Sequence, residues 1–217
     1  MANQSHLDLL KQGTFTWNMW RREHLHIQPD LSGADLSGAD LRGGDLRGTD
    51  LEGVGVDLHD ANLQGINLSK AHLRANFIRA DLKRANLTGA TFYGGDLRGA
   101  DLREALLDEV DLKGISMGGA NLSGLDLRGR DLSGMDLNVA NLSGADLRGT
   151  NLKGAHLIRA DLRYARLNEA DLGEADLSGA DLSKANFSRA NLRGAVLKGA
   201  ILRETNFAGA DLTDTTT

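Results

Sequence analysis

The sequence contains no cysteine, only one proline and few aromatic residues. Without cysteine, the chain can form neither disulfide bonds nor thiolate metal sites, and a reducing compartment is compatible with this composition. Aromatic residues make up 4% of the 217 residues but hydrophobic residues make up 41%, which is compatible with one ordinary domain. The single proline and the 27 glycines follow from a repeat that runs through most of the chain.

Targeting and membrane signals are also missing. Residues 1–11 lack both a basic segment and a long apolar segment of the kind that begins a secretory signal. No run of the chain approaches the roughly 18 apolar residues of a membrane-spanning helix. We therefore expect a soluble, cytoplasmic protein that does not bind membranes.

The sequence has no motif typical of an enzyme. It contains no phosphate-binding loop, and its serines have no histidine placed by a recognisable motif to activate them. His24 and His26 are close together, but no third ligand joins them at metal-binding spacing. We predict no catalytic, metal or cofactor site, because regularly spaced carboxylates on a filled rod provide no concave pocket for acid–base chemistry.

A repeat of five residues dominates what is present. From Phe77 to Leu212 a large apolar residue returns at every fifth position without a slip. The residue two positions earlier is usually Ala, and the residue one position earlier is usually Asp or Asn. The unit is therefore Ala-(Asp/Asn)-Leu-x-Gly, a fixed short period that indicates a repeat architecture.

A period of five matches neither a helix, which repeats at 3.6 residues, nor a half-buried strand, which repeats at two. If each unit forms one side of a closed coil, the Leu and Ala side chains point inward and the Asp or Asn side chain points outward. Glycine would let the backbone turn the corner without strain at Cβ. Coils that stack at the strand spacing of about 4.8 Å would form a one-dimensional solenoid.

Units such as 34–38 (Ala-Asp-Leu-Ser-Gly) and 145–149 (Ala-Asp-Leu-Arg-Gly) resemble those of the pentapeptide-repeat family. The resemblance extends from Asp30 to about Leu212. It implies an all-β fold, a right-handed quadrilateral parallel β-helix with four units in each of about nine coils. The motif is specific for the fold and says little about function, because many members of the family have no known activity.

The sequence divides into an N-terminal helical cap, residues 1–29, and a β-helix, residues 30–217. We expect one helix from about Gln4 to Glu23 that plugs the first coil, because the ends of solenoids need a cap. Trp17 and Trp20 lie in this cap; the alternative is that they form a partner-binding patch. Two breaks in the period are expected, two extra residues near 52–57, where Gly53 and Gly55 would allow a bulge, and one missing residue near 74–76.

Acidic residues gather near the start of the repeats and on one expected face further along. Residues 30–60 contain eight acids against two basic residues, Arg42 and Arg47, although the net charge of the whole chain is −5. We regard the following residues as a candidate acidic interaction surface: Asp30, Asp35, Asp40, Asp45, Asp50, Glu52, Asp57, Asp60, Asp111, Asp131, Asp171 and Glu174.

Arg130 occupies an inward position that usually holds Ala. A buried guanidinium without a partner would cost several kcal/mol. One interpretation is that the backbone bulges here and lets Arg130 reach solvent, towards Asp131 or Asp111. The other is a locally distorted recognition site between Val110 and Val139.

The resemblance also implies a hypothesis for function. Members of the family that resist gyrase poisons resemble B-DNA in width and charge, and they occupy the DNA-binding saddle of type II topoisomerases. We therefore expect a protein-binding solenoid whose partner is DNA gyrase or topoisomerase IV, with a link to antibiotic resistance. The alternative is a scaffold that binds another protein.

Two further expectations concern partners. Direct binding of nucleic acid is disfavoured, because the basic residues form no patch interleaved with aromatic residues. An exposed last coil would leave main-chain groups unpaired. A homodimer through the C-terminal coils, which some members of the family form, would bury that edge.

Overall fold

The structure is a computed structural model that describes residues 2–52, 55–92 and 94–217. It contains two compact units, Met1–Asp111 and Leu112–Thr217. Each unit is described by itself below.

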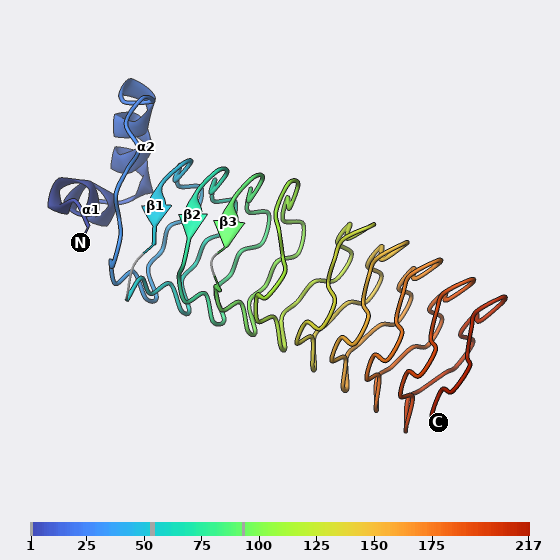
Figure 1. Cartoon of the computed structure of the whole chain (residues 1–217). Coiled ribbons are helices and arrows are strands. Elements are labelled where there is room, and N and C mark those ends of the chain that lie inside the picture. The colour runs from blue at the N-terminus through green and yellow to red at the C-terminus, as the bar shows by residue number, and fades with distance from the viewer. Residues whose placement is uncertain (1, 53–54, 93) are drawn as a thin grey trace. The chain divides into compact units, whose positions relative to one another are not determined.

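Both units consist of coils that stack through parallel backbone pairing (Figure 1). In residues 112–217, Asn121 pairs with Asn141, Asn141 with Asp161, and Asp161 with Asp181. The paired residues are 20 apart in the sequence, so one coil contains four units of five. Residues that pair in successive coils are called a column below.

Extended structure occurs as single paired positions and as three short strands in residues 2–52, 55–92 and 94–111. These are β1 (Asp50–Leu51), β2 (His72–Leu73) and β3 (Thr91–Phe92), which form a parallel sheet in the order β1-β2-β3. Leu51 pairs with Leu73, and Leu73 pairs with Phe92, so the large apolar residues of successive coils lie next to one another.

The unit from Ala145 to Gly149 shows why five residues suffice for one side of a coil. The N–H of Asp146 donates to the preceding coil, at the carbonyl of Leu125 (2.9 Å). The N–H groups of Leu147 and Gly149 donate to the following coil, at distances of 2.7 Å and 3.0 Å.

The remaining two N–H groups of this unit are satisfied locally. The N–H of Ala145 donates to the carbonyl of Leu142 (3.0 Å), and the N–H of Arg148 donates to Oδ1 of Asp146 (3.4 Å). Every backbone donor of the unit therefore has an acceptor, as buried N–H groups require. The outward Asp or Asn closes its own turn by accepting the N–H two residues further on.

The core is formed by the Leu and Ala columns, which confirms the predicted inward positions. Leu147, Leu157 and Ala145 are fully buried. Larger residues stand at the Ala position in some units and are also buried there: Val110, Ile115, Leu125 and Met135. The exposed apolar residues of the last coil, Leu202 and Leu212, have no following coil over them in residues 112–217.

The pairing register changes where the period of the sequence changes. Asp35 pairs with Asp57, which is 22 residues away, and His72 pairs with Thr91, which is 19 residues away. These spacings differ from 20 by the two extra residues near 52–57 and the one missing residue near 74–76. Gly53, expected in the bulge, lies outside the described residues.

The last position of each unit turns the corner with a positive φ. Gly144 has a φ of 66°, in a region that glycine enters without strain at Cβ. Glu169 (62°) and the β-branched Val139 (60°) adopt the same conformation. The ladder on either side therefore holds the corner even where the residue does not favour it.

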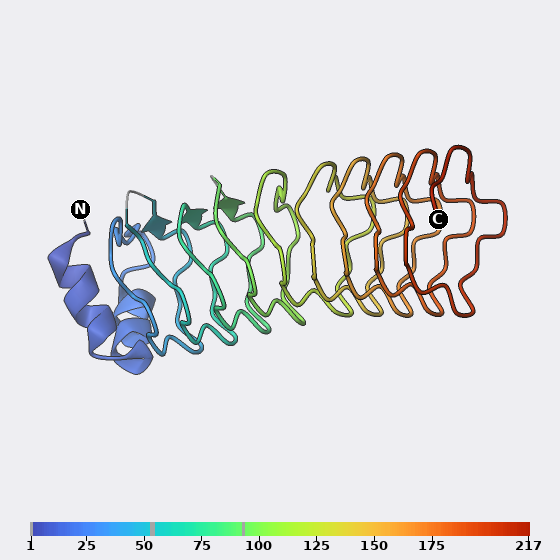
Figure 2. The ribbon, with the colours of Figure 1, turned by 90° about the horizontal axis from the view of Figure 1, so that it is seen from below.

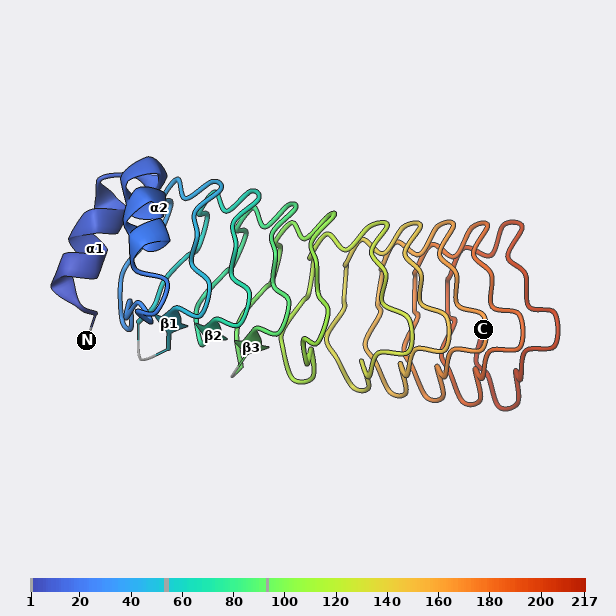
Figure 3. The ribbon, with the colours of Figure 1, turned by 90° about the horizontal axis from the view of Figure 1, so that it is seen from above.

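The cap contains two helices, so the prediction of one continuous helix was wrong. Helix α1 covers Gln4–Lys11 and helix α2 covers Thr14–Glu23. Between them Gly13 has a φ of 107°, which no α-helix contains. Figures 2 and 3 show both helices at the end of the unit that carries β1. None of the helices in the described residues is long and apolar enough to cross a membrane.

Helix α2 is attached to the coils by polar contacts as well as by packing. Trp17 is fully buried, and its Nε1–H donates to the carbonyl of Asp45 (2.7 Å). Asn18 donates from Nδ2 to the carbonyl of Gly43 (2.9 Å) and accepts the N–H of Asp45 at Oδ1 (2.8 Å). The helix therefore covers the first coils, as expected of a cap.

Replacing a Leu of the core should destabilise the protein far more than the same change on the surface. For Leu147→Ala we expect a loss of about 2–5 kcal/mol in the free energy of unfolding, because a cavity opens between three coils. Leu106, at an outward position, is 53% exposed, so Leu106→Ala should change the free energy by about 0.5 kcal/mol or less. Urea denaturation followed by circular dichroism measures both, and equal losses would contradict the inward assignment.

Candidate interaction surfaces

The acids of residues 30–60 lie on all four faces of the coil. Pairing places Asp30 with Asp50, Asp35 with Asp57, Asp40 with Asn62, and Asp45 with Asn67, each pair in a different column. Consecutive units occupy consecutive sides, so neighbours in the sequence point in different directions. The acidic run therefore does not form a single acidic face.

Several of these carboxylates are also neutralised. Arg42 contacts Asp40 (2.6 Å), Arg47 contacts Asp45 (2.7 Å), and Arg79 contacts Asp60 (2.5 Å). Asp57 has His59 Nδ1 at 2.9 Å, and Glu52 has His72 Nδ1 at 3.9 Å.

Two neighbouring columns keep unneutralised acids. Asp30 and Asp50, which pair with each other, and Asp35 in the next column form no ion pair within the described residues. Hydrogen bonds from Ser32 hold the pKa of Asp30 below its usual range, and those from Ser37 do the same for Asp35. These three carboxylates therefore remain charged at neutral pH.

Further along, Asp131 and Asp171 lie in one column, with Asn151 between them. Lys113 Nζ lies 3.4 Å from Asp131, and Asn191 donates from Nδ2 to Asp171 (2.7 Å). The nearby Glu174 has Lys153 at 3.7 Å. Asp111 is exposed and belongs to the other unit, Met1–Asp111.

The main chain at Arg130 is regular, so the bulge expected there was wrong. Its N–H donates to the carbonyl of Leu127 (3.2 Å), and its carbonyl accepts the N–H of Asn151 (2.9 Å). Neighbouring units make the same two bonds. The side chain of Arg130 is half-buried.

The two tryptophans of the cap differ in their surroundings. Trp17 is fully buried, whereas Trp20 is half-buried. The rings of Trp20 and His24 stack with centroids 5.0 Å apart, and those of Trp17 and Trp20 are tilted with centroids 5.3 Å apart. Trp17 therefore packs the cap and cannot contact a partner while the cap is in place.

The structure contains a recurrent pair that was not predicted. Wherever the unit reads Asp-Leu-Arg, the guanidinium turns back onto the carboxylate two residues earlier. Arg148 donates from Nε to Oδ1 (2.8 Å) and from Nη2 to Oδ2 (2.7 Å) of Asp146. The same two-pronged pair occurs at 40–42, 45–47, 96–98, 101–103, 126–128 and 161–163. The tripeptide is visible in the sequence and could have indicated these pairs.

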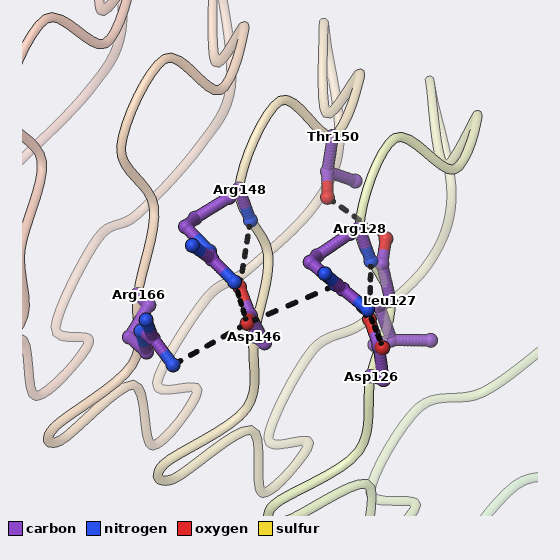
Figure 4. A network of polar contacts seen from close by, with 7 residues as sticks. All are labelled: Asp126, Leu127, Arg128, Asp146, Arg148, Thr150 and Arg166. Carbon is purple, nitrogen blue, oxygen red and sulfur yellow. Dashed lines mark hydrogen bonds and ion pairs between the residues drawn. The ribbon is translucent and has the colours of Figure 1, made fainter.

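In residues 112–217 these pairs converge into a cluster of arginines (Figure 4). Asp146 accepts from Arg148 and also has Arg166 Nη1 at 3.5 Å and Arg128 Nε at 4.0 Å. Arg128 in turn holds Asp126 at 2.5 Å. Three guanidinium groups thus share two carboxylates, which leaves one positive charge in excess.

The excess arises at Arg166, which occupies an outward position. The column contains Asp126, Asp146, Arg166 and Asn186. Two residues after Arg166 stands Asn168, which donates from Nδ2 to Ser188 Oγ. The cluster borders a hollow of about 580 Å³, and Arg189, held by Glu169 at 2.6 Å, lines it too. We call Arg128, Arg148, Arg166 and Arg189 the arginine surface.

A metal site is not supported by the described residues, among which no group of three His, Cys, Asp or Glu side chains could hold an ion. The geometry therefore defines a charged repeat protein whose surface residues are held by hydrogen bonds.

The chain belongs to the pentapeptide-repeat family. The family model for pentapeptide repeats matches eight copies that together cover residues 28–103 and 105–216. The fold of this family is the right-handed quadrilateral β-helix. No curated protein sequence matches the chain.

Several solved structures are similar. HetL, a pentapeptide repeat protein involved in heterocyst differentiation regulation in the cyanobacterium Nostoc sp. strain PCC 7120, is 35% identical. The match covers 87% of this chain and 85% of HetL, with a TM-score of 0.68.

Two other structures are similar over less of the fold. A thylakoid-lumen protein of Arabidopsis thaliana is 44% identical over 43% of this chain and 65% of its own, with a TM-score of 0.42. QnrB1, a plasmid-mediated fluoroquinolone resistance protein, is 21% identical over 81% of this chain and 83% of its own, with a TM-score of 0.38.

The pairing with Arg128 has a consequence for pH. Hydrogen bonds from its guanidinium lower the pKa of Asp126 from 3.8 to about 2. A carboxyl whose pKa is lower in the folded state stabilises the fold above its unfolded pKa. That contribution is lost as the pH falls from about 3.8 to about 2.

We expect Arg128→Gln to move the titration of Asp126 up towards 3.8. Carboxyl chemical shifts measured by NMR against pH would follow it. Arg103→Gln, which removes a similar pair in residues 1–111, is the control and should leave Asp126 unchanged. An unmoved midpoint in Arg128→Gln would show that this pair does not form in solution.

Proposed function

We propose that this chain is a non-enzymatic scaffold that binds an acidic partner protein through the arginine surface. The observation that carries the proposal is the excess charge at Arg166, whose guanidinium shares the carboxylate of Asp146 with Arg148. Arg166 is half-exposed and has capacity for further hydrogen bonds to a carboxylate.

The arginine surface has the character of an interface. Arginine is enriched at protein–protein interfaces and among the residues that dominate binding. Here Arg128 and Arg148 are already oriented by their carboxylates, so they lose little freedom when a partner binds. The hollow of about 580 Å³ beside them would accept side chains of the partner.

A role without catalysis is supported by how the acids are used. The carboxylates of the repeat accept backbone N–H groups of their own turns, as Asp131 does from Ser133 and Asp176 does from Ser178. Hydrogen bonds from Ser133 hold the pKa of Asp131 below its usual range, which is unsuited to a general acid or base at neutral pH. The likeness to HetL adds support for a regulatory role exerted through binding.

Affinity capture tests the proposal. The tagged chain is used to isolate proteins from its native cell extract, and each candidate is then purified and titrated directly. Arg166→Ala should weaken binding of the true partner by about tenfold. Arg203→Ala, an exposed arginine outside the surface, should have little effect. Equal binding by both variants would refute the arginine surface as the binding site.

A type II topoisomerase such as DNA gyrase is a second candidate partner. The observation that favours it is the pair of columns with Asp30, Asp35 and Asp50, whose carboxylates lack an ion pair in the described residues. The neutralisation of Asp40, Asp45 and Asp60 by arginines weighs against a continuous DNA-like surface. A homodimer through the C-terminal coils stays a prediction, supported by the exposure of Leu202 and Leu212.

DNA supercoiling by purified gyrase, in the presence of a gyrase poison, tests this candidate. If the chain acts on gyrase, it should inhibit supercoiling or relieve the poison, and Asp35→Asn with Asp50→Asn should weaken the effect. Asp181→Asn, a change of the same kind in residues 112–217, is the control. No effect at high micromolar concentration would eliminate this partner.

A further inference from the structure

A small cavity lies where the cap meets the first coils. It measures about 260 Å³ and is lined by residues from α2, from the loop after it and from two coils. The side chains that concern us are Arg21, His26, Arg47, Lys70 and His72. No Asp or Glu is among the described residues that line it.

Arg21 is the unusual member of this group, because it is only 3% exposed. Its Nη1 and Nη2 donate to the carbonyls of Ile27 (2.8 Å) and Arg47 (3.0 Å), and both of these acceptors are uncharged. Its Nε–H is buried with no hydrogen-bond partner in the described residues. Burial lowers the pKa of Arg21, as expected for a charge that has lost its water.

A buried guanidinium normally has an anion in contact with it. The nearest acidic influence on Arg21 comes from Asp45, whose carboxylate is held by both prongs of Arg47 at 2.7 Å. Asp45 therefore neutralises one of the two arginines. The positive charge of the other is uncompensated at the cavity.

The opposite wall adds more positive charge. Lys70 is exposed and forms no ion pair in the described residues. His72 contacts Glu52 only at 3.9 Å, and its Nδ1 lies 3.4 Å from Thr91 Oγ1. His26 is exposed at the rim. Each of these side chains carries N–H groups that can donate to an oxyanion.

We propose that this cavity binds a phosphate-class oxyanion, either the free ion or the phosphoryl group of a small molecule. Phosphate oxygens accept several hydrogen bonds at once, and a doubly charged ion would compensate Arg21 and Lys70 together. The volume of the cavity leaves room beyond one phosphate ion for the first atoms of an ester. Because the walls come from α2, the 24–28 loop and two coils, the anion would tie the cap to the repeats. This site is separate from the arginine surface and independent of its function.

The test uses the full chain and two probes, inorganic phosphate and glycerol 3-phosphate, titrated at constant ionic strength. Tryptophan fluorescence reports binding, since Trp17 and Trp20 are the protein's two tryptophans and both lie in the cap. Isothermal titration calorimetry measures the stoichiometry. We expect one saturable site and a rise in melting temperature on binding.

Two lysine variants decide the location. Lys70→Gln should weaken binding by about tenfold, because it removes a charged donor from the wall. Lys198→Gln, an exposed lysine of residues 112–217, should bind as the wild type does. Circular dichroism confirms that both variants are folded.

The outcomes separate the two sources of the anion. Tighter binding of glycerol 3-phosphate than of phosphate would indicate a phosphorylated small molecule, and tighter binding of phosphate would indicate the free ion. The proposal is overturned if no saturable binding occurs at millimolar concentrations. Equal weakening by Lys70→Gln and Lys198→Gln would overturn it as well, because it would show only general attraction of anions.

Discussion

The backbone ladder between coils is the constraint on which the rest of this structure depends. Each unit sends one N–H to the coil before it and two to the coil after it, as Asp146, Leu147 and Gly149 do. The spacing of the ladder brings equivalent residues of successive coils together, so Leu stacks on Leu inside. Neighbouring coils therefore depend on each other, and a unit by itself has no core.

The ladder also explains why so many surface residues are acidic or amides. An Asp or Asn before the Leu closes its own turn by accepting the N–H two residues on, as Asn141 does from Ser143. The acid is thus first a structural residue, and the arginine that often follows at the same N–H position neutralises it. Functional charge on such a protein must be sought where this arrangement is broken, as at Arg166 and Arg21.

The sequence predicted the coil, the inward Leu and Ala, and the shifts in register, because all of these follow from the period of five. The spread of the acids over four faces follows from four units per coil and could have been worked out as well. The break at Gly13 depends on a backbone conformation that the apolar pattern of the cap conceals. The cluster around Asp146 joins residues 18 to 20 apart in sequence, so only the stacked coils bring Arg128 and Arg166 to it.

Amide hydrogen exchange of residues 112–217, measured by NMR, tests the central claim most directly. If the ladder between coils carries the fold, the N–H groups of Leu147, Leu157 and Leu167, which donate to the following coil, should exchange together and slowly. The N–H of Arg148, which donates only to a side chain of its own turn, should exchange faster. Exchange of Leu147 at the rate of Arg148 would contradict the account.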